Sequence, residues 1–436
     1  MPVTSPVNLP ADISPVPPPD AAVTAAASSA GIRLRDHPAF ILFWISRVCS
    51  ALAFQMLGVV VGWLVYSLTG SAAALGLVGL AQFLPILCLT LLVGHVADTF
   101  DRRRIVLACQ TLSALTVGAL ALAEGSGHAG LLPIYAAVVT IGASRAFEAP
   151  TMAALLPRLV PGEVLPRALA VASSAMQMAT IAGPAVGGFA YIFGPAVPLT
   201  LAAVCYGVAA VAMAFIRHVH APGPRSAMTL ETLLSGLSFI RRSPVVLGSI
   251  SLDLFAVLLG GVTALLPIYA AEILHVGAQG LGALRAAPAV GAVLMSIVLV
   301  RRPPTRQVGH VMFAAVAVFG LATVVFSLSS SFLLSLGALF VLGAADNVSV
   351  VIRSSLVQLS TPDEMRGRVS AVNSLFVGTS NQLGEFESGM VAALIGAVGA
   401  GVVGGVGTLM VVALWTRLFP ALFHVDAMPV KVETRR

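Results

Sequence analysis

The sequence predicts an all-α polytopic membrane protein with twelve transmembrane helices in two pseudo-symmetric six-helix halves. Of its 436 residues, 58% are hydrophobic and only 10% are charged, a composition that soluble domains do not have. Apolar runs of about 20 residues, the length that crosses the hydrocarbon core, recur along the chain. The second half of the chain also repeats part of the first. These three observations define the fold class.

The N-terminal region and the first six apolar runs form the first half of the prediction. Residues 1–35 are rich in Pro, Ala and Ser and lack the features of a secretory signal, so we expect a disordered cytoplasmic tail. The first half then covers residues 36–216. Its spans are expected at 39–66, 75–97, 105–123, 131–147, 168–193 and 197–216.

The second half repeats this arrangement after a cytoplasmic linker expected at residues 217–244. It covers residues 245–420, and residues 421–436 are expected to form a cytoplasmic tail. Its spans are expected at 245–271, 280–300, 308–328, 332–352, 369–397 and 400–420.

The basic residues give the orientation of these spans. Alternate loops hold almost all of them, whereas the loops near Thr69, Gly125, Gly194, His275, Ser330 and Gly399 have no Lys or Arg. Because positive loops stay in the cytoplasm, both termini are expected there, in a multi-pass protein of the cytoplasmic membrane. The basic residues stand between apolar runs and not along one face, so no nucleic-acid partner is expected.

An internal repeat relates the two halves at an offset of 201 residues. It matches Pro161 with Pro362, Glu163 with Glu364, and Gly188 with Gly389. A duplication of a six-helix unit explains why one register holds from a loop into a helix. The alternative is chance matching in a sequence rich in Ala and Gly.

The charged turn from Gly94 to Arg104 resembles the signature loop of the major facilitator superfamily. Gly94, Asp98, Arg102 and Arg103 fit its pattern, while Asp101 and Thr99 depart from it. The resemblance implies a latch, in which Asp98 accepts hydrogen bonds from the N-terminus of a neighbouring helix until the helices move. The alternative is an ordinary positive cytoplasmic turn.

A glycine-rich segment in the fifth span resembles the core of the superfamily's antiporter motif, which the family associates with export. Its residues are Gly183, Pro184, Gly187 and Gly188. Pro184 removes a backbone hydrogen bond, and the glycines allow close helix packing. Segments at 252–261, 284–292, 366–369 and 380–385 resemble the branch of transmembrane secretion effectors that includes the enterobactin exporter.

Charged residues inside the spans are candidates for substrate binding and proton coupling, because a charge at a helix centre costs about 2.5–3.5 kcal/mol on insertion scales. Arg47 and Asp253 lie at like depth in the first helices of the two halves and could form an ion pair. Glu385 and Glu387 point about 200° apart, so at most one faces a central cavity squarely. Arg285 either attracts an anionic substrate or extends its side chain to the membrane interface, and extension to the interface is the simpler interpretation.

Two further pairs are candidates for gating contacts near the cytoplasmic ends of their helices. Arg145 and Glu148 lie three residues apart on one helical face, and Asp346 precedes Arg353 by seven residues. A solvated or interfacial ion pair is the more frequent outcome for such residues.

These features together predict a secondary active transporter that exports a small molecule, such as a siderophore, a drug or a metabolite, in exchange for protons. No nucleotide-binding loop is present in the sequence, and neither a cofactor nor a metal site is expected. The expected partners are a small-molecule substrate, protons and the lipid bilayer. An importer and a transport-inactive membrane sensor or scaffold stay as alternatives, whereas an enzyme is not expected.

Overall fold

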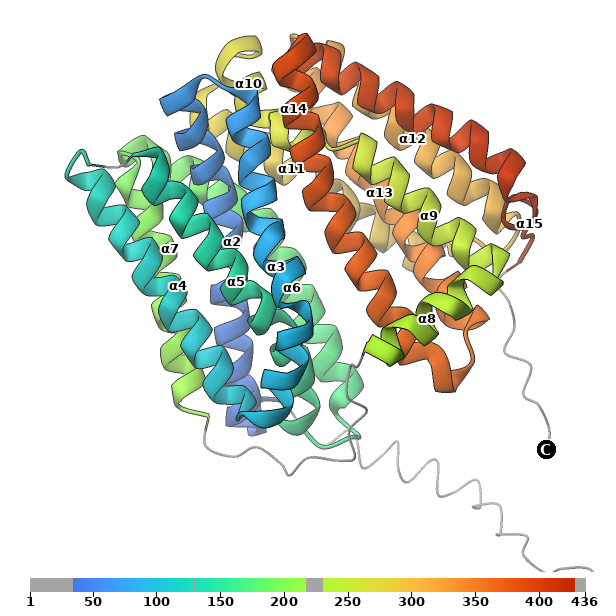
Figure 1. Ribbon diagram of the computed structural model, residues 1–436, viewed down its shortest axis with the longest axis horizontal. Coiled ribbons are helices and arrows are strands. Elements are labelled where there is room, and N and C mark those ends of the chain that lie inside the picture. Colours follow the sequence, from blue (N-terminus) through green and yellow to red (C-terminus); the bar gives the residue numbers. More distant parts are fainter. Residues whose placement is uncertain (1–33, 129, 217–229, 428–436) are drawn as a thin grey trace, which may run out of the picture.

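The computed structural model describes residues 34–128, 130–216 and 230–427, and within these ranges the regular structure is entirely helical (Figure 1). Eleven of the described helices are long and apolar enough to cross a membrane. The chain is therefore a multi-pass membrane protein. The predicted tail at 1–33, part of the linker, and residues 428–436 lie outside the described residues.

The first half contains six long helices and short 3-10 turns. A 3-10 turn at Leu34–Asp36 leads into the first long helix. The long helices are α2 (Pro38–Thr69), α3 (Ala72–Thr99), α4 (Arg102–Gly125), α5 (Leu131–Leu155), α6 (Leu165–Ala190) and α7 (Ala196–Ala214). Two more 3-10 turns follow α5 and α6, at Leu156–Arg158 and Tyr191–Phe193.

The second half starts with a short helix, α8 (Leu230–Arg242), and then crosses the molecule repeatedly. Its elements are α9 (Pro244–Leu259), the 3-10 turn Val262–Leu265, α10 (Leu266–Ile268), a π-helical turn at Tyr269–Ile273, α11 (Gly277–Arg301), α12 (Val308–Leu328), α13 (Phe332–Ser360), α14 (Asp363–Leu418) and α15 (Pro420–Phe423).

α14 contains the last two predicted spans. Gly396 has φ of 80°, a left-handed conformation that glycine adopts at little cost, and it interrupts the helical backbone between them. Figure 1 shows the chain turning back at this point. Because α14 contains two of the predicted spans, the eleven apolar helices account for all twelve.

The predicted span at 245–271 is interrupted, which the sequence analysis did not anticipate. α9 ends at Leu259, and the Gly260–Gly261 pair separates it from the following 3-10 turn. A Cβ atom on Gly261 would lie 2.6 Å from the carbonyl oxygen of Gly384. The break therefore lets this segment approach the backbone of α14 more closely than a side chain would permit.

Parts of the predicted linker and of the predicted C-terminal tail pack against the rest of the protein. The linker predicted at 217–244 contains α8, on which Ser235 accepts a hydrogen bond of 3.2 Å from Arg368 of α14. The predicted tail at 421–436 begins with packed residues, because the carbonyl oxygens of Val425 and Asp426 accept hydrogen bonds from the first backbone N–H groups of α12. These bonds satisfy donors that a helix N-terminus otherwise leaves open.

The two halves lie side by side and meet through two pairs of helices, α6 with α11 and α3 with α14. Glycines line both contacts. A Cβ on Gly188 would lie 2.8 Å from Cα of Gly282, and a Cβ on Gly389 would lie 2.5 Å from Cα of Gly76. Gly188 and Gly389 are partners in the 201-residue repeat, so the repeat places equivalent glycines at equivalent contacts.

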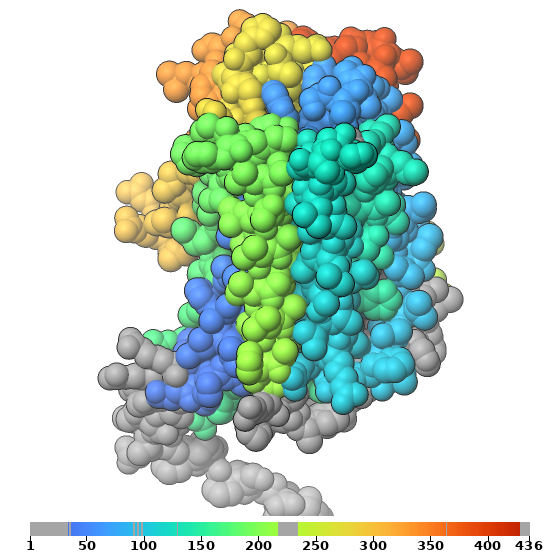
Figure 2. Space-filling view, turned by 90° about the vertical axis from the view of Figure 1, so that its left-hand side faces the viewer, coloured from blue at the N-terminus to red at the C-terminus, as the bar shows by residue number. Residues whose placement is uncertain are grey.

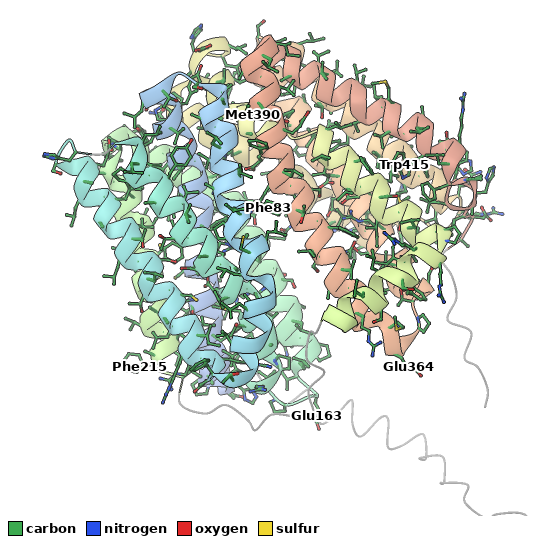
Figure 3. All side chains as sticks on the ribbon, viewed as in Figure 1. Phe83, Glu163, Phe215, Glu364, Met390 and Trp415 are labelled. Carbon is green, nitrogen blue, oxygen red and sulfur yellow. The ribbon has the colours of Figure 1, made fainter. Side chains whose placement is uncertain are left out.

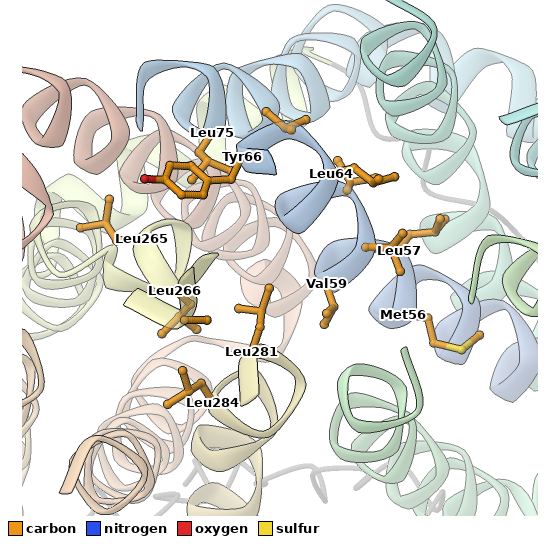
Figure 4. Packing of buried hydrophobic residues seen from close by; sticks show 14 of the residues in the cluster. Met56, Leu57, Val59, Leu64, Tyr66, Leu75, Leu265, Leu266, Leu281 and Leu284 are labelled. Atoms are coloured by element: carbon orange, nitrogen blue, oxygen red, sulfur yellow. The ribbon is translucent and has the colours of Figure 1, made fainter. Parts of the chain in front are cut away.

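The halves share one apolar core near one face of the molecule. Figure 4 shows residues of this core from both halves, including Leu64 and Tyr66 of α2 with Leu265 and Leu281 of the second half. Towards the opposite face, each half has separate cores, against which Leu34 and Val425 pack near the two ends of the described chain; this face is called here the termini side. The ribbons diverge in the same direction (Figure 1), and the repeat partners Glu163 and Glu364 lie at the lower end of this view in their respective halves (Figure 3).

The outer surface of the first half is apolar. Figure 2 shows α4 and α7 running side by side along it. Large side chains on these helices are exposed, among them Leu115, Leu122, Val204 and Val211. A lipid bilayer solvates such a surface, whereas water does not.

Candidate functional site

A cavity of about 420 Å³ lies between the halves, within the size range of small-molecule sites. Most of its lining comes from the second half, and α6 of the first half supplies Gln177 and Thr180. Apolar residues such as Phe319 and Leu342 alternate with polar ones. The polar side chains that line it are Gln177, Thr180, Thr263, Arg285, Asp346, Asn347 and Asn381.

A smaller cavity of about 130 Å³ shares Arg285 with the larger one, and α2, α3, α11 and α14 supply most of its lining. Both halves line it. Its residues are Phe54, Gln55, Gly58, Val61, Gly62, Leu75, Val78, Gln82, Ala264, Arg285 and Glu385. Arg285 therefore borders both spaces.

Arg285 lines both cavities inside the molecule. The simpler prediction, that its side chain extends to the membrane interface, is therefore wrong. Arg285 projects from α11 of the second half towards α2 of the first. A Cβ on Gly58 would lie 2.5 Å from its Nη1 atom, so the glycine makes room for the guanidinium group. Its charge interacts with that of Glu385, although no ion pair joins the two within the described residues.

Glu385 and Glu387 of α14 have different surroundings. Glu385 lines the smaller cavity and packs against α3. A Cβ on Gly79 of α3 would lie 2.9 Å from the Cβ of Glu385. Glu387 is not among the residues that line either cavity, and its carboxylate accepts a hydrogen bond of 3.4 Å from Ser388. Of the two, Glu385 is therefore the one that reaches the space between the halves.

Asp346 of α13 lines the large cavity and also a small pocket that it shares with Asp253. Its carboxylate makes no hydrogen bond or ion pair within the described part of the chain. The neighbouring Asn347 donates a hydrogen bond of 3.0 Å to Ser296 of α11. Asp346 thus presents a carboxylate without a fixed partner to the cavity.

The predicted pairing of Arg47 with Asp253 is wrong for this conformation, as is that of Asp346 with Arg353. Asp253 of α9 instead forms an ion pair with Arg353 of α13, and both side chains are buried. The predicted pairs were residues at like depth in, or close together along, their helices. Depth along a helix does not fix which helix lies opposite, and α13 packs against α9 within the second half.

In the first half a buried hydrogen-bond network holds Glu148, so within the described residues it forms neither the predicted gating pair with Arg145 nor the alternative solvated pair. Its Oε1 atom accepts bonds from Ser50 of α2 at 2.6 Å and from Gln110 of α4 at 2.9 Å. Ser46 completes the network through Gln110. Nearby, the Arg145 guanidinium stacks 3.9 Å above the ring of Phe54.

Arg47 belongs to the same charged group, because Arg145 and Glu148 are the charged residues that act on it electrostatically. Its Nε atom is buried and has no hydrogen-bond partner within the described residues.

The two halves carry opposite charges at equivalent positions. Arg47 and Asp253 each lie nine residues after the first residue of α2 and α9. Arg145 and Asp346 each lie fourteen residues after the first residue of α5 and α13. At these two positions the first half is basic and the second half is acidic; the sequence analysis compared the first pair, and the helix bounds add the second.

The charged turn at 94–104 connects α3 to α4 and ties together helix ends on the termini side. Asp101, where the sequence departs from the superfamily pattern, accepts a 2.9 Å bond from the backbone N–H of Arg103 and so caps α4. The Arg103 side chain donates to the carbonyl oxygens of Met213 and Ala214 at the end of α7. Arg102 likewise donates to the carbonyl of Ala154, at 3.1 Å. The proposed latch residues Gly94 and Asp98 lie outside the described side chains.

The glycines of α6 pack against two different helices. Gly183 and Gly187 face α2, where a Cβ on Gly187 would lie 3.1 Å from the carbonyl oxygen of Met56. Gly188 faces α11 of the other half. Pro184 lies inside α6, and its carbonyl oxygen would lie 2.6 Å from a Cβ on Gly282. This segment therefore joins the core of the first half to the interface between the halves.

Contacts that the sequence did not reveal close the face opposite the termini side. The hydroxyl of Tyr66 on α2 donates a hydrogen bond to Glu272 in the π-helical turn of the second half. The glycine contacts described above reinforce the same region. A lone Tyr and a lone Glu 206 residues apart carry no sequence signal of contact.

Within the described residues no group of three or more His, Cys, Asp or Glu side chains lies close enough to hold a metal ion. The cysteines Cys49, Cys88, Cys109 and Cys205 are all free thiols.

Comparison with known proteins agrees with this architecture. The family model of the transmembrane secretion effectors matches residues 30–432. The enterobactin exporter EntS of Escherichia coli (strain K12) is 25% identical over 405 residues, which covers 92% of this chain and 96% of that protein. EntS of Shigella dysenteriae serotype 1 gives the same values.

Solved transporter structures share the fold at low sequence identity. The nucleoside transporter NupG has a TM-score of 0.68 at 14% identity and covers 87% of this chain and 99% of its own. A bacterial homologue of the iron transporter ferroportin, in its inward-facing state, has a TM-score of 0.65 at 17% identity and covers 90% of this chain and 100% of its own. The chain is a transporter and not an enzyme, and it belongs to the transmembrane secretion effector family of the major facilitator superfamily.

Proposed function

We propose that this protein exports a small organic molecule across the cytoplasmic membrane in exchange for protons, and that it does so by alternating access at the cavity between its halves. The observation that carries the proposal is the convergence of Arg285, Asp346 and Glu385 on the space between two halves that touch at one face. Charges are costly in the membrane, and this chain concentrates three where a substrate would bind. The similarity to enterobactin exporters supports the outward direction.

The conformation described above corresponds, in this proposal, to a cavity that is accessible from the cytoplasm. The basic loops lie on the termini side, where the two halves have separate cores, and positive loops remain cytoplasmic. Two of the similar solved transporters are described as inward-facing. Reorientation would break the Tyr66–Glu272 contact and bring the termini sides of the halves together.

Antiport requires that a proton and the substrate compete for one group, and we propose that this group is Asp346. A carboxylate without a fixed cation nearby can be neutralised either by a proton or by the substrate. Glu385 faces Arg285 instead and would act as its counter-charge in the empty cavity. Asp253 is already neutralised by Arg353. One elementary charge moving down a 100 mV potential supplies about 2.3 kcal/mol, enough to drive a substrate against its gradient.

The test is proton movement in proteoliposomes that contain a trapped pH dye. A panel of siderophores and lipophilic drugs is added to one side, and internal pH is followed for the wild type, Asp346→Asn and Glu385→Gln. We expect a substrate in the panel to move protons in the opposite direction, and we expect Asp346→Asn to abolish that movement. Glu163→Gln, an exposed carboxylate on the termini side, is the matched control and should behave as the wild type.

Each other outcome contradicts a stated part of the proposal. Protons that move in the same direction as the substrate would show symport and favour an importer. Substrate binding without any flux would favour a membrane sensor. Antiport that survives in Asp346→Asn but is lost in Glu385→Gln would transfer the exchange role to Glu385.

A further inference from the structure

The large cavity contains two side chains of opposite charge that are not in ion pairs, and Glu385, whose charge acts on one of them, lines the smaller cavity instead. Arg285 of α11 and Asp346 of α13 both line the large cavity. The described residues provide no ion pair for either, and the buried Nε atom of Arg285 has no hydrogen-bond partner. By contrast, Asp253 and Arg353, which both belong to the second half, form an ion pair and neutralise each other.

This arrangement differs from what a purely cationic or purely anionic ligand needs. A cation would find Asp346 but would also face the guanidinium of Arg285, and an anion would face the carboxylate. Leaving a buried charge unpaired is expensive, so each single-charge ligand leaves one end of the cavity uncompensated. A ligand with one positive and one negative group compensates both.

We propose that the cavity selects zwitterionic organic molecules, with the anionic group on Arg285 and the amine or other cationic group on Asp346. The inference rests on the proposed function, because it names the substrate class of the same cavity. Phe319 and Leu342 give the apolar walls for the body of the molecule, and Gln177 of α6 gives a hydrogen-bonding group from the other half. A ligand of this kind touches both halves.

Three dyes that share one xanthene frame provide the test. Rhodamine 110 is zwitterionic, rhodamine 123 is its cationic methyl ester, and fluorescein keeps the carboxylate but replaces the amines with oxygen. Binding of each to the purified full chain in detergent is measured by fluorescence polarisation, without any gradient. We expect rhodamine 110 to bind at least about tenfold more tightly than either of the others, which is about 1.4 kcal/mol.

Two substitutions then assign the two ends. Arg285→Gln is expected to remove the preference for rhodamine 110 over rhodamine 123, and Asp346→Asn the preference over fluorescein. Exposed residues of the same type serve as controls: Arg301→Gln and Glu163→Gln should leave the dye ranking unchanged. Thermal melts of every variant check that it is folded.

The proposal is overturned if the wild type binds rhodamine 123 or fluorescein as tightly as rhodamine 110, a result that needs no variant. Equal weakening of all three dyes by both cavity substitutions also overturns it. A retained zwitterion preference without proton exchange in proteoliposomes would contradict the proposed antiport alone. Proton exchange without any dye preference would contradict this inference alone.

Discussion

Glu148 shows how a buried carboxylate is held in this protein without a direct ion pair. Its carboxylate accepts bonds from Ser50 and Gln110, and no basic side chain lies within ion-pair distance in the described part of the chain. Hydrogen bonds to charged groups contribute more than those between neutral groups, about 1.5–3 kcal/mol each. Three helices, α2, α4 and α5, meet at this one side chain.

Replacing Gln110 tests this account at the residue scale. Gln110→Leu removes one donor and leaves the buried Glu148 carboxylate with a single hydrogen bond, so we expect the free energy of unfolding to fall by about 1–3 kcal/mol. Chemical unfolding in detergent micelles measures the change. Gln358→Leu, at an exposed glutamine, is the control and should alter stability by less than about 0.5 kcal/mol. An equal loss in both variants would show that the network does not stabilise the fold.

Helix pairs in this molecule approach through glycine, and the interface between halves depends on it. Gly188 of α6 meets Gly282 of α11 with no room for a side chain. Without a hydrophobic driving force between helices in lipid, such close packing is what holds them together. The same reasoning applies to α3 and α14.

Substitution of Gly188 tests this interface at the scale of elements. Gly188→Val places atoms within about 2.7–2.8 Å of the α11 backbone, so α6 and α11 must separate and the closed face should open. We expect a cysteine introduced at Val276, at the start of α11 on that face, to react faster with a membrane-impermeant maleimide, and transport to be lost. Gly207→Val is the matched control, because no atom lies within 4 Å of its Cβ position. Unchanged labelling in Gly188→Val would contradict the role of this contact.

Sequence patterns predicted the positions of the helices well, but they predicted the contacts between helices poorly. Hydropathy located the spans because each helix is solvated by lipid on one side, a property of that helix alone. The break at Gly260 and the surface helix α8 depend on contacts with α14, which the pattern within one segment does not contain. Pairings failed for the same reason: Asp253 meets Arg353 across a helix contact that only the assembled fold defines.

At the scale of the whole molecule, one conformation is held by contacts on one face. Tyr66 and Glu272 join α2 to the π-helical turn, beside the shared apolar core. The termini side has no core that spans both halves among the described residues. In the proposed alternating-access cycle, the free energy of the contacts on the closed face sets the balance between the two orientations of the cavity.

Removing the Tyr66 hydroxyl tests this balance. Tyr66→Phe deletes the hydrogen bond to Glu272 and keeps the ring, so we expect the population to shift towards the orientation that is open on this face, by about two- to thirteenfold for a bond of about 0.5–1.5 kcal/mol. Distances between spin labels on the two halves report the populations. Tyr135→Phe is the control, because its hydroxyl donates to Ala74 within the first half. A shift of equal size in both variants would contradict the assignment.

The opposite charges at equivalent positions also bear on how the two halves recognise each other. A pair of first halves would carry Arg47 and Arg145 twice, and a pair of second halves would carry Asp253 and Asp346 twice. Charges of one sign are costly to gather inside a membrane protein, whereas the single chain carries both signs at these positions. If the 201-residue repeat reflects a duplication, as predicted, these charges make the two halves distinguishable, which favours assembly within a single chain over exchange of halves between neighbouring molecules.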